Sequence, residues 1–469
     1  ASGVSTIGYL DNPNNPNSNF FELDGTALGD ATFDLNPKEG SFIYNGQSVN
    51  YFPLAYLPDQ IDHMDYELLN QLLEPACCDK SEIESTSGNV ISLISTNGNP
   101  VSTLNGSYTN WNFKIRGELI IPDGYSVTLD NCTVEVADDE FNDIKSRIVV
   151  ENGGKLILKN GSQLTSANCP NSMWQGVYVQ GNHTQPHASE SEHGVFEIYD
   201  SEISNAITGV KNYDLNGDPS GGIVKAERAT FRNNQRDIDL ASIATDNTSS
   251  VIGCHLLQDA PLGRGLSPVA HLQVLAGTNG GPVTVTGNTF EHVNANPATP
   301  EKWGTGIYLS QADVNIEKGH VPQPGGSVLL NVPNTFKNLL YGIDIAGIGG
   351  MDNVNIKGNV FEDNVYGVVN EGNWYAEIVD NTFKVPAYTG GLSLPGQKTG
   401  NFKTYGIFTN AATGYSYAEN TFLQGAGDHT GQASAFPGAR LIIGDESAPV
   451  EDGALLVIDG YISDIGPRG

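Results

Sequence analysis

A group of titratable side chains near the middle of the chain has the residue types that acid–base chemistry needs. Asp237 and Asp239 are two residues apart in a predicted strand, so we expect both on one face. His193 in the segment SEHG could serve as a base. Three arginines lie close by in the sequence: Arg228, Arg232 and Arg236. Sugar hydrolases use paired carboxylates, and lyases use a base with a cation or an arginine, so both reaction classes must be considered.

These residues match none of the motif sets of polygalacturonases, pectin methylesterases or pectate lyases. The chain has only 23 Lys and Arg in 469 residues, too few to line a cleft for anionic sugars. We therefore interpret Arg236 and Asp237 as a solvated charge cluster and assign no catalytic residue.

Aromatic residues in the predicted loops are the candidates for ligand binding: Trp174, Trp303 and Tyr388, with Tyr405 at a loop exit. Their rings could stack on the faces of sugars. The alternative is that Trp174 and Trp303 cover the hydrophobic end of a neighbouring loop. The residue types alone leave both interpretations open.

One loop resembles part of a calcium-binding loop. In YDLNGDPSGG, Asp214, Asn216 and Asp218 have the 1, 3, 5 spacing of calcium ligands. The sixth position is Pro219 where Gly is expected, and the twelfth is Lys225 where Glu is expected. A full site of the EF-hand type is therefore excluded, and either partial calcium ligation or a polar turn remains.

The composition limits the partners. The formal net charge is −31, with 54 Asp and Glu. Such a surface repels nucleic acid and anionic membranes, so we expect neither as a partner. Calcium is the one cofactor that this carboxylate content favours, and solubility in a salty medium is the alternative explanation. No run of roughly 18 apolar residues occurs, so we predict no membrane insertion.

A repeat becomes visible when the sequence is aligned on the motif N-x-F. The anchors are GNTF, PNTF, GNVF, DNTF and ENTF, which end at Phe290, Phe336, Phe361, Phe383 and Phe422. Six residues after Phe336 and Phe361 comes a Gly followed by Ile or Val, and the shortest complete repeat is 22 residues. Short strands of this period, with no helix between them, are typical of a solenoid.

We therefore predict an all-β fold, a right-handed parallel β-helix of about 9–11 coils. The Phe anchors should stack inward as a ladder, and Asn334, Asn359 and Asn381 should form a second ladder at one turn. Insertions within 164–176, 290–306 and 383–406 should form one loop face, and a second corner should carry insertions at 181–192, 212–222 and 310–333.

We divide the chain into three parts. Residues 1–110 are an extended capping region with one amphipathic helix at about 60–74, residues 111–440 are the β-helix, and residues 441–469 are a C-terminal strand, cap or linker. The five cysteines are Cys77, Cys78, Cys132, Cys169 and Cys254. Their spacing fits no zinc site and leaves the disulfide pairing open. Cys254 falls on a repeat position that Phe usually holds, which predicts a buried free thiol.

Three stretches carry a family resemblance: GELIIPDGYSVTLDNCTVEV, RIVVENGGKLILKNGSQLTS, and MWQGVYVQGN followed by DSEISNAITGV. Over about 110–430 the chain resembles secreted β-helix repeat proteins of Bacteroidetes-type bacteria, which have a pectate-lyase-like fold. The resemblance implies export by the type IX system and a location at the cell surface or outside the cell. It also implies a C-terminal sorting domain, whereas the chain begins at Ala1 without Met and ends in SDIGPRG, so we expect a segment of a longer product.

The function we expect is that of a structural or adhesive extracellular protein, a rigid segment of a surface appendage, filament or large adhesin. Its partners would be further copies of itself or other surface-protein subunits. The alternatives are a polysaccharide-active enzyme, either lyase or glycoside hydrolase, and a carbohydrate-binding module, both with polysaccharide as the partner.

Overall fold

The computed structural model describes residues 40–44, 47–51, 90–94, 104–137, 146–167, 172–241, 246–275, 281–293, 303–347, 353–372, 375–386, 405–410, 416–425, 453–458 and 461–467. The chain divides into two compact units, residues 1–77 and 78–469. In the first unit the described residues form an antiparallel hairpin of β1 (Gly40–Tyr44) and β2 (Gln47–Tyr51). The predicted helix at 60–74 lies outside the described residues.

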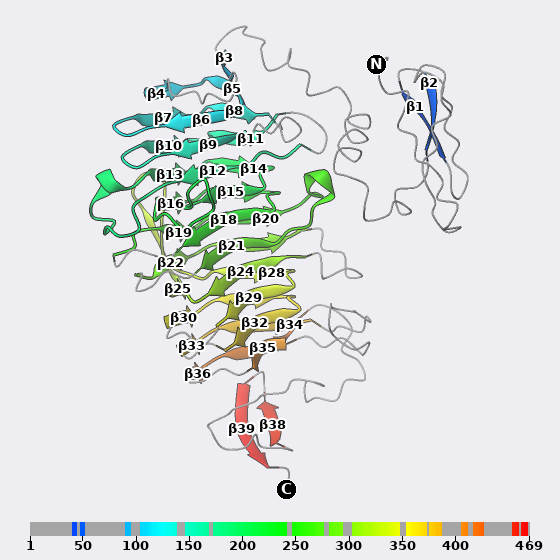
Figure 1. Cartoon of the computed structure of the whole chain (residues 1–469). Coiled ribbons are helices and arrows are strands. Elements are labelled where there is room, and N and C mark those ends of the chain that lie inside the picture. The colour runs from blue at the N-terminus through cyan, green and yellow to red at the C-terminus, as the bar shows by residue number, and fades with distance from the viewer. Residues whose placement is uncertain are drawn as a thin grey trace, which may run out of the picture. The chain divides into compact units, whose positions relative to one another are not determined.

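The second unit is built from three long parallel sheets, whose strands stack in chain order, coil upon coil (Figure 1). The 11-stranded sheet contains β4 (Gly106–Thr109), β7 (Ser126–Asp130), β10 (Lys155–Lys159), β13 (Val195–Tyr199), β16 (Ile223–Glu227), β19 (Ser250–Ile252), β22 (Val283–Thr286), β25 (Val314–Glu317), β30 (Asn353–Lys357), β33 (Tyr375–Val379) and β36 (Ser416–Ala418).

The 12-stranded sheet contains β3 (Val90–Ile94), β5 (Asn112–Arg116), β8 (Thr133–Val136), β11 (Gln163–Ser166), β14 (Glu202–Ser204), β17 (Thr230–Arg232), β20 (His255–Gln258), β23 (Thr289–His292), β28 (Thr335–Lys337), β31 (Val360–Glu362), β34 (Thr382–Val385) and β37 (Thr421–Gln424). The 10-stranded sheet contains β6 (Glu118–Ile121), β9 (Arg147–Val150), β12 (Val177–Val179), β15 (Thr208–Lys211), β18 (Arg236–Ala241), β21 (Ala270–Leu275), β24 (Thr305–Ser310), β29 (Tyr341–Ala346), β32 (Tyr366–Glu371) and β35 (Tyr405–Asn410).

The remaining described elements are short. The hairpin β26 (Gly319–Pro322) and β27 (Val328–Val332) and the hairpin β38 (Gly453–Ile458) and β39 (Tyr461–Pro467) are antiparallel. Two 3₁₀ turns, η4 (Glu190–Glu192) and η5 (Gly263–Gly265), interrupt loops. Among the described residues no helix is long and apolar enough to cross a membrane.

The predicted fold is confirmed for the described residues: they are all-β apart from two 3₁₀ turns, and the parallel sheets of the second unit form a parallel β-helix. Among the described residues, the strands of the 10-stranded sheet give ten complete coils, within the predicted range of about 9–11. The parallel sheets already include β3 and β4, so the solenoid begins before the predicted boundary at residue 111. Alternate residues of most strands are buried, as in β10 and β30, and this alternation supplies the core.

The predicted Phe ladder is confirmed. Phe336 stacks on Phe361 with ring centroids 4.8 Å apart, and Phe361 stacks on Phe383 at 4.6 Å. Phe290 and Phe422 extend the stack at its two ends. The strand register carries the same column through the earlier coils, where it holds Phe113, Val134, Leu164, Ile203, Phe231 and Leu256.

The predicted Asn ladder is also present, and its bonds run between coils. The Asn359 Oδ1 atom accepts a bond of 2.9 Å from the Asn334 side chain, and the Asn359 backbone N–H donates to Asn381 Oδ1 at 2.9 Å. The Asn359 Nδ2 group donates to the carbonyl of Ile316 in the preceding coil. The side chains of Asn359 and Asn381 therefore satisfy main-chain groups that the turn would otherwise bury without partners.

The register corrects one sequence alignment. Leu256, not Cys254, pairs with Phe231 and Phe290 in the Phe column. Cys254 lies two residues earlier, in the Asn column, where its backbone N–H donates to Asn288 Oδ1 at 2.8 Å. Its predicted state is nevertheless confirmed, because the Cys254 thiol is free and buried. Cys132 is likewise free and buried, and the other three cysteines lie outside the described residues.

The insertions occur at three corners rather than two. Those within 164–176, 290–306 and 383–406 all connect the 12-stranded sheet to the 10-stranded sheet, as predicted. Those at 181–192 and 212–222 connect the 10-stranded sheet to the 11-stranded sheet. The expectation that 310–333 belongs with these two is wrong for its main part, because the hairpin β26–β27 connects β25 to β28 at the third corner.

Candidate functional site

Asp237 is buried in the solenoid and does not belong to a solvated charge cluster. Its side chain is 1% exposed. Its Oδ2 atom lies 2.6 Å from His271 Nδ1, and the Asn234 side chain donates to Oδ1 at 2.8 Å. The interpretation of Arg236 and Asp237 as a solvated cluster is therefore wrong for Asp237. Burial raises the pKa of the Asp237 carboxyl, and His271 opposes that shift.

The neighbouring coils explain why this pair lies inside. The residue that aligns with Asp237 and His271 is Gly in later coils, and a Cβ added to Gly342 or Gly367 would lie 2.8 or 2.7 Å from a ring carbon of the Phe ladder. Gly is required there because the ring occupies the space of a side chain. In the coils of Asp237 and His271 polar side chains replace Gly, and the smaller Leu256 takes one position in the Phe column.

Asp239 has a different environment from Asp237. Its Oδ1 atom accepts a bond of 3.2 Å from the Gln273 side chain, and it is 8% exposed. Burial raises the pKa of the Asp239 carboxyl, while Arg236 and Tyr213 oppose the shift. The two carboxylates thus bond to different partners, although both were expected on one face.

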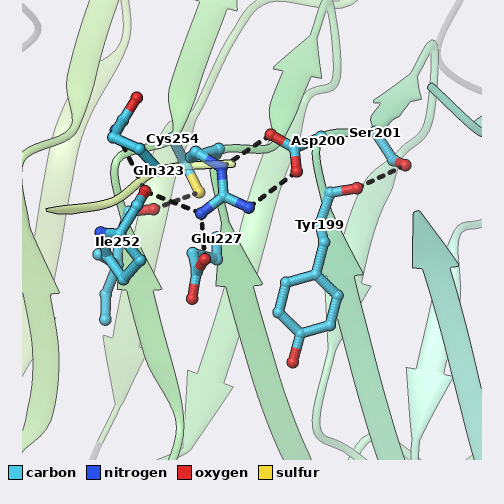
Figure 2. A network of polar contacts seen from close by, with 9 residues as sticks. Tyr199, Asp200, Ser201, Glu227, Ile252, Cys254 and Gln323 are labelled. Carbon is cyan, nitrogen blue, oxygen red and sulfur yellow. Dashed lines mark hydrogen bonds and ion pairs between the residues drawn. The ribbon is translucent and has the colours of Figure 1, made fainter. Parts of the chain in front are cut away.

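Two of the three arginines, Arg228 and Arg232, have separate partners. Arg228 binds Asp200 through two bonds of 2.7 and 2.8 Å and also pairs with Glu227. Figure 2 shows the carboxylates of Asp200 and Glu227 joined by dashed lines to one guanidinium group. The hydrogen bonding that Arg228 donates to Asp200 is the main cause that raises the pKa of the Arg228 guanidinium. Arg232 pairs with Asp259 at 3.5 Å. These pairs form no common site with Asp237.

His193 is fully buried and fastens two loops together. Its Nδ1 atom lies 2.8 Å from the carbonyl oxygen of Gly221, and its Nε2 atom lies 3.1 Å from that of Pro186. The His187 ring packs edge-on against it, with centroids 4.9 Å apart, and His187 Nε2 also contacts the Gly221 oxygen. His187 was not among the expected site residues, although it lies in the insertion at 181–192 that directly precedes His193.

His187 must remain neutral in this arrangement. The backbone N–H of Thr248 donates to His187 Nδ1 at 3.0 Å, so that nitrogen must carry a lone pair. Burial, followed by the neighbouring His193, lowers the pKa of His187 to about 4. Both histidines therefore lie between loops, where neither could reach a polymer in solution.

The candidate calcium ligands Asp214, Asn216 and Asp218 lie in a polar turn. Asp214 Oδ1 accepts bonds from the backbone N–H groups of Asn216 and Asp218 at 2.8 and 2.9 Å. The bond from Asp218 is the main cause that lowers the pKa of the Asp214 carboxyl. Within the described part of the chain, no group of three His, Cys, Asp or Glu is arranged to hold a metal ion. The hydrogen bonds of this loop are those of a polar turn, and partial calcium ligation stays an untested prediction.

The aromatic candidates separate into two places. Trp174 is 1% exposed in the main core, and its Nε1–H donates to the carbonyl of Ser204 at 2.9 Å. Trp303 is 4% exposed in a second hydrophobic cluster with Leu340, Val365, Tyr366 and Val369. Packing therefore describes both tryptophans, and Tyr388 lies outside the described residues.

Tyr405 joins the cluster of Trp303 and is partly exposed. It stacks on Tyr366 with centroids 5.4 Å apart, and Tyr366 stacks on Tyr341 at 5.1 Å. The structure thus brings Trp303 and Tyr405 together and leaves Trp174 elsewhere. The sequence signal for the additional tyrosines is the repeated pair Tyr–Gly at the start of β29, β32 and β35.

Two comparisons with known proteins found no match. No protein-family model matches the chain, and no curated protein matches it.

Proposed function

We propose that this chain is a rigid β-helical segment of a structural or adhesive protein that works outside the cell or at the cell surface. The observation that carries the proposal is the unbroken pair of ladders from β23 to β37. Each coil there bonds and stacks on the next through identical Asn and Phe side chains. In such a solenoid the contact between neighbouring coils governs stiffness along the axis.

The positions of the ionisable residues also support a non-catalytic role. The side chains considered for acid–base chemistry are turned away from solvent: Asp237 is 1% exposed, Asp239 is 8% exposed and His193 is fully buried. A general acid or base has to come within hydrogen-bond distance of the substrate. Without rearrangement these three side chains could not contact a polysaccharide.

The net charge indicates how ions should affect the binding of partners. A chain with a formal charge of −31 repels further copies of itself at low ionic strength, and divalent cations screen or bridge carboxylates. We therefore propose that assembly with further copies or with other surface proteins depends on calcium or on ionic strength.

The test is to incubate the purified chain with neutral and acidic polysaccharides, with and without calcium. Reducing ends report hydrolysis, and unsaturated products report lyase activity. We expect neither product. Turnover that Asp237→Asn or His193→Gln abolishes, in variants with unchanged circular dichroism, would replace this proposal with the enzyme alternative.

Carbohydrate binding is the second candidate, and the partly exposed Tyr341 and Tyr405 beside Trp303 favour it. Aromatic rings at a surface stack on sugars. Co-sedimentation with insoluble polysaccharides is the test, with Tyr405→Ala as the variant. Binding that this change weakens would favour the module, and equal binding by both proteins would place the sugar elsewhere.

A further inference from the structure

The hairpin β26–β27 interrupts the solenoid at the third corner. The chain leaves the 11-stranded sheet after β25, forms the two antiparallel strands and enters the 12-stranded sheet at β28. Among the described residues β27 is hydrogen-bonded to β26 on one side and to no strand on the other. Its outer edge is thus open for pairing.

The inner face of the hairpin is fixed to the wall of the solenoid. Val321, 4% exposed, fills the space above two turns: a Cβ on Gly253 or Gly287 would overlap its methyl groups. Both glycines have positive φ, +64° and +66°, which only Gly adopts readily. The hairpin therefore packs at a defined position against the coils that precede it.

Polar contacts also fix the hairpin to the solenoid at two places. Arg228, which binds Asp200 and Glu227, also donates a bond of 2.8 Å to the carbonyl oxygen of Pro322 in β26. Lys318, at the base of the hairpin, pairs with Asp380 two coils further on. The strands are thus anchored from the turn of Arg228 to the turn of Asp380.

The outer strand exposes three consecutive apolar side chains. Val328, Leu329 and Leu330 are 46%, 52% and 65% exposed. Successive side chains of a strand point to opposite faces, so β27 is apolar on both faces. A run of this kind on a free edge strand is typical of a surface that pairs with another strand.

The charge distribution indicates which strand that is. Residues 319–336 contain no Asp, Glu, Lys or Arg, in a chain that has 54 acidic residues. Two copies of the chain, each of net charge −31, repel one another over most of their surfaces. At this hairpin they can approach without placing like charges together.

We propose that β27 is a self-association surface, in which the open edge of one copy pairs antiparallel with the open edge of a second copy. A two-fold axis at Leu329 places Val328 of each copy opposite Leu330 of the other. Asn331, whose φ is +53°, ends the regular strand and limits the pairing to this segment. The inference rests on the proposed structural role only for the choice of a second copy as the partner.

The first experiment compares two substitutions of the same type. Val328→Lys alters β27, and Val293→Lys alters an apolar residue of nearly equal exposure, 47%, outside the hairpin. Both changes reduce the net negative charge equally. Sedimentation equilibrium over a concentration series gives the dimer dissociation constant. We expect at least a tenfold weaker dimer for Val328→Lys and no change for Val293→Lys. Each Lys would place an ammonium group opposite the apolar Leu330 of the other copy, and the two like charges would lie diagonally across the interface.

The second experiment detects the contact itself. In an antiparallel pair centred on Leu329, the two Cα atoms lie about 4.5–5.5 Å apart, within the range that a disulfide spans. Mild oxidation of Leu329→Cys should therefore give a reducible dimer beyond that formed by the wild-type chain, whereas Val293→Cys should give none.

A wild-type chain that stays monomeric at all concentrations would overturn this inference, as would a dimer that Val328→Lys leaves intact. Capture of a different protein by a monomeric chain would likewise exclude a second copy as the occupant. Polysaccharide turnover by a chain that still dimerises through β27 would overturn the proposed function alone, so the two failures are distinguishable.

Discussion

The two halves of the solenoid share the same backbone arrangement, but they fill the core and bond the turns with different side chains. The C-terminal half, β22 to β37, uses Phe in one column and Asn in the next. In the N-terminal half, β4 to β21, the Asn column holds Cys132, Ser162, Ser201, Ala229 and Cys254, and the Phe column is mostly aliphatic.

The N-terminal half provides hydrogen-bond partners for the backbone groups of its turns through other residue types. Ser162 Oγ accepts the backbone N–H of Cys132 at 3.0 Å and donates to the carbonyl of Leu129, which is the work that Asn does later in the chain. The comparison teaches that the solenoid requires hydrogen-bond partners for the backbone groups of each turn and side chains that fill the core of each coil. Repetition of one residue type is a separate feature that the C-terminal half adds.

The largest effect is expected in the Phe ladder. Phe361→Ala removes a ring stacked on both sides and should cost about 3–5 kcal/mol, because the cavity is enclosed by Phe336, Phe383 and Gly342. Urea unfolding gives the loss of stability, and hydrogen exchange shows in which half it occurs. Phe361→Leu, which imitates Leu256, should lose less. A loss no greater than that of Leu423→Ala, which alters a residue 37% exposed, would contradict the ladder.

The N-terminal half should lose stability in acid through His187. Its pKa falls from 6.5 in the unfolded chain to about 4 in the folded one, so the unfolded chain binds more protons between these values. Stability is therefore lost as the pH falls from about 6.5 through 4, by up to about 3 kcal/mol. His187→Gln should make thermal stability less dependent on pH over this range. An unchanged pH profile in that variant would refute the assignment.

The C-terminal half should respond to pH in the opposite direction through Asp344. Burial, with a smaller contribution from Glu371, raises its pKa to about 6. A raised carboxyl pKa stabilises the folded state at pH below about 4, and this contribution is lost as the pH rises through 6. Asp344→Asn should raise stability by about 1–3 kcal/mol at pH 8 and leave it nearly unchanged at pH 4. Equal effects at the two pH values would show that the charge of Asp344 is not responsible.

A smaller effect is expected in the Asn ladder. Asn359→Ala leaves the side-chain amide of Asn334 and the carbonyl of Ile316 with fewer partners, and should cost about 1–2 kcal/mol. Asn359→Ser, which introduces the hydroxyl that Ser162 uses in its own turn, should recover part of the loss. A shift in thermal melting within experimental error for Asn359→Ala would mean that water replaces the side chain, and that the ladder is not a source of stability.

The fold could be predicted because its signal repeats. The spacing from Phe336 to Phe361 and from Phe361 to Phe383 reports stacked coils whatever the other residues are. The alignment slipped by two residues at Cys254 because strands have a period of two. Both Cys254 and Leu256 are apolar and buried, and only the strand register distinguishes them.

The side-chain environments were harder to predict than the coils. Asp237 replaces a single Gly, and its partner His271 lies 34 residues later, so no local pattern indicates a buried pair. The length of an insertion likewise does not say whether its aromatic residue folds back: Trp174 does so, into the core, while Trp303 packs in a separate cluster. Both outcomes depend on tertiary packing, which periodicity does not encode.

Electron microscopy of the native surface material, labelled with an antibody raised against this chain, tests the proposed structural role most directly. Ten complete coils at about 4.8 Å per coil give a rod of roughly 50 Å for each chain. The account predicts label along rods or filaments, at intervals no shorter than this length. Label confined to dispersed particles that form no assembly, with or without calcium, would contradict it.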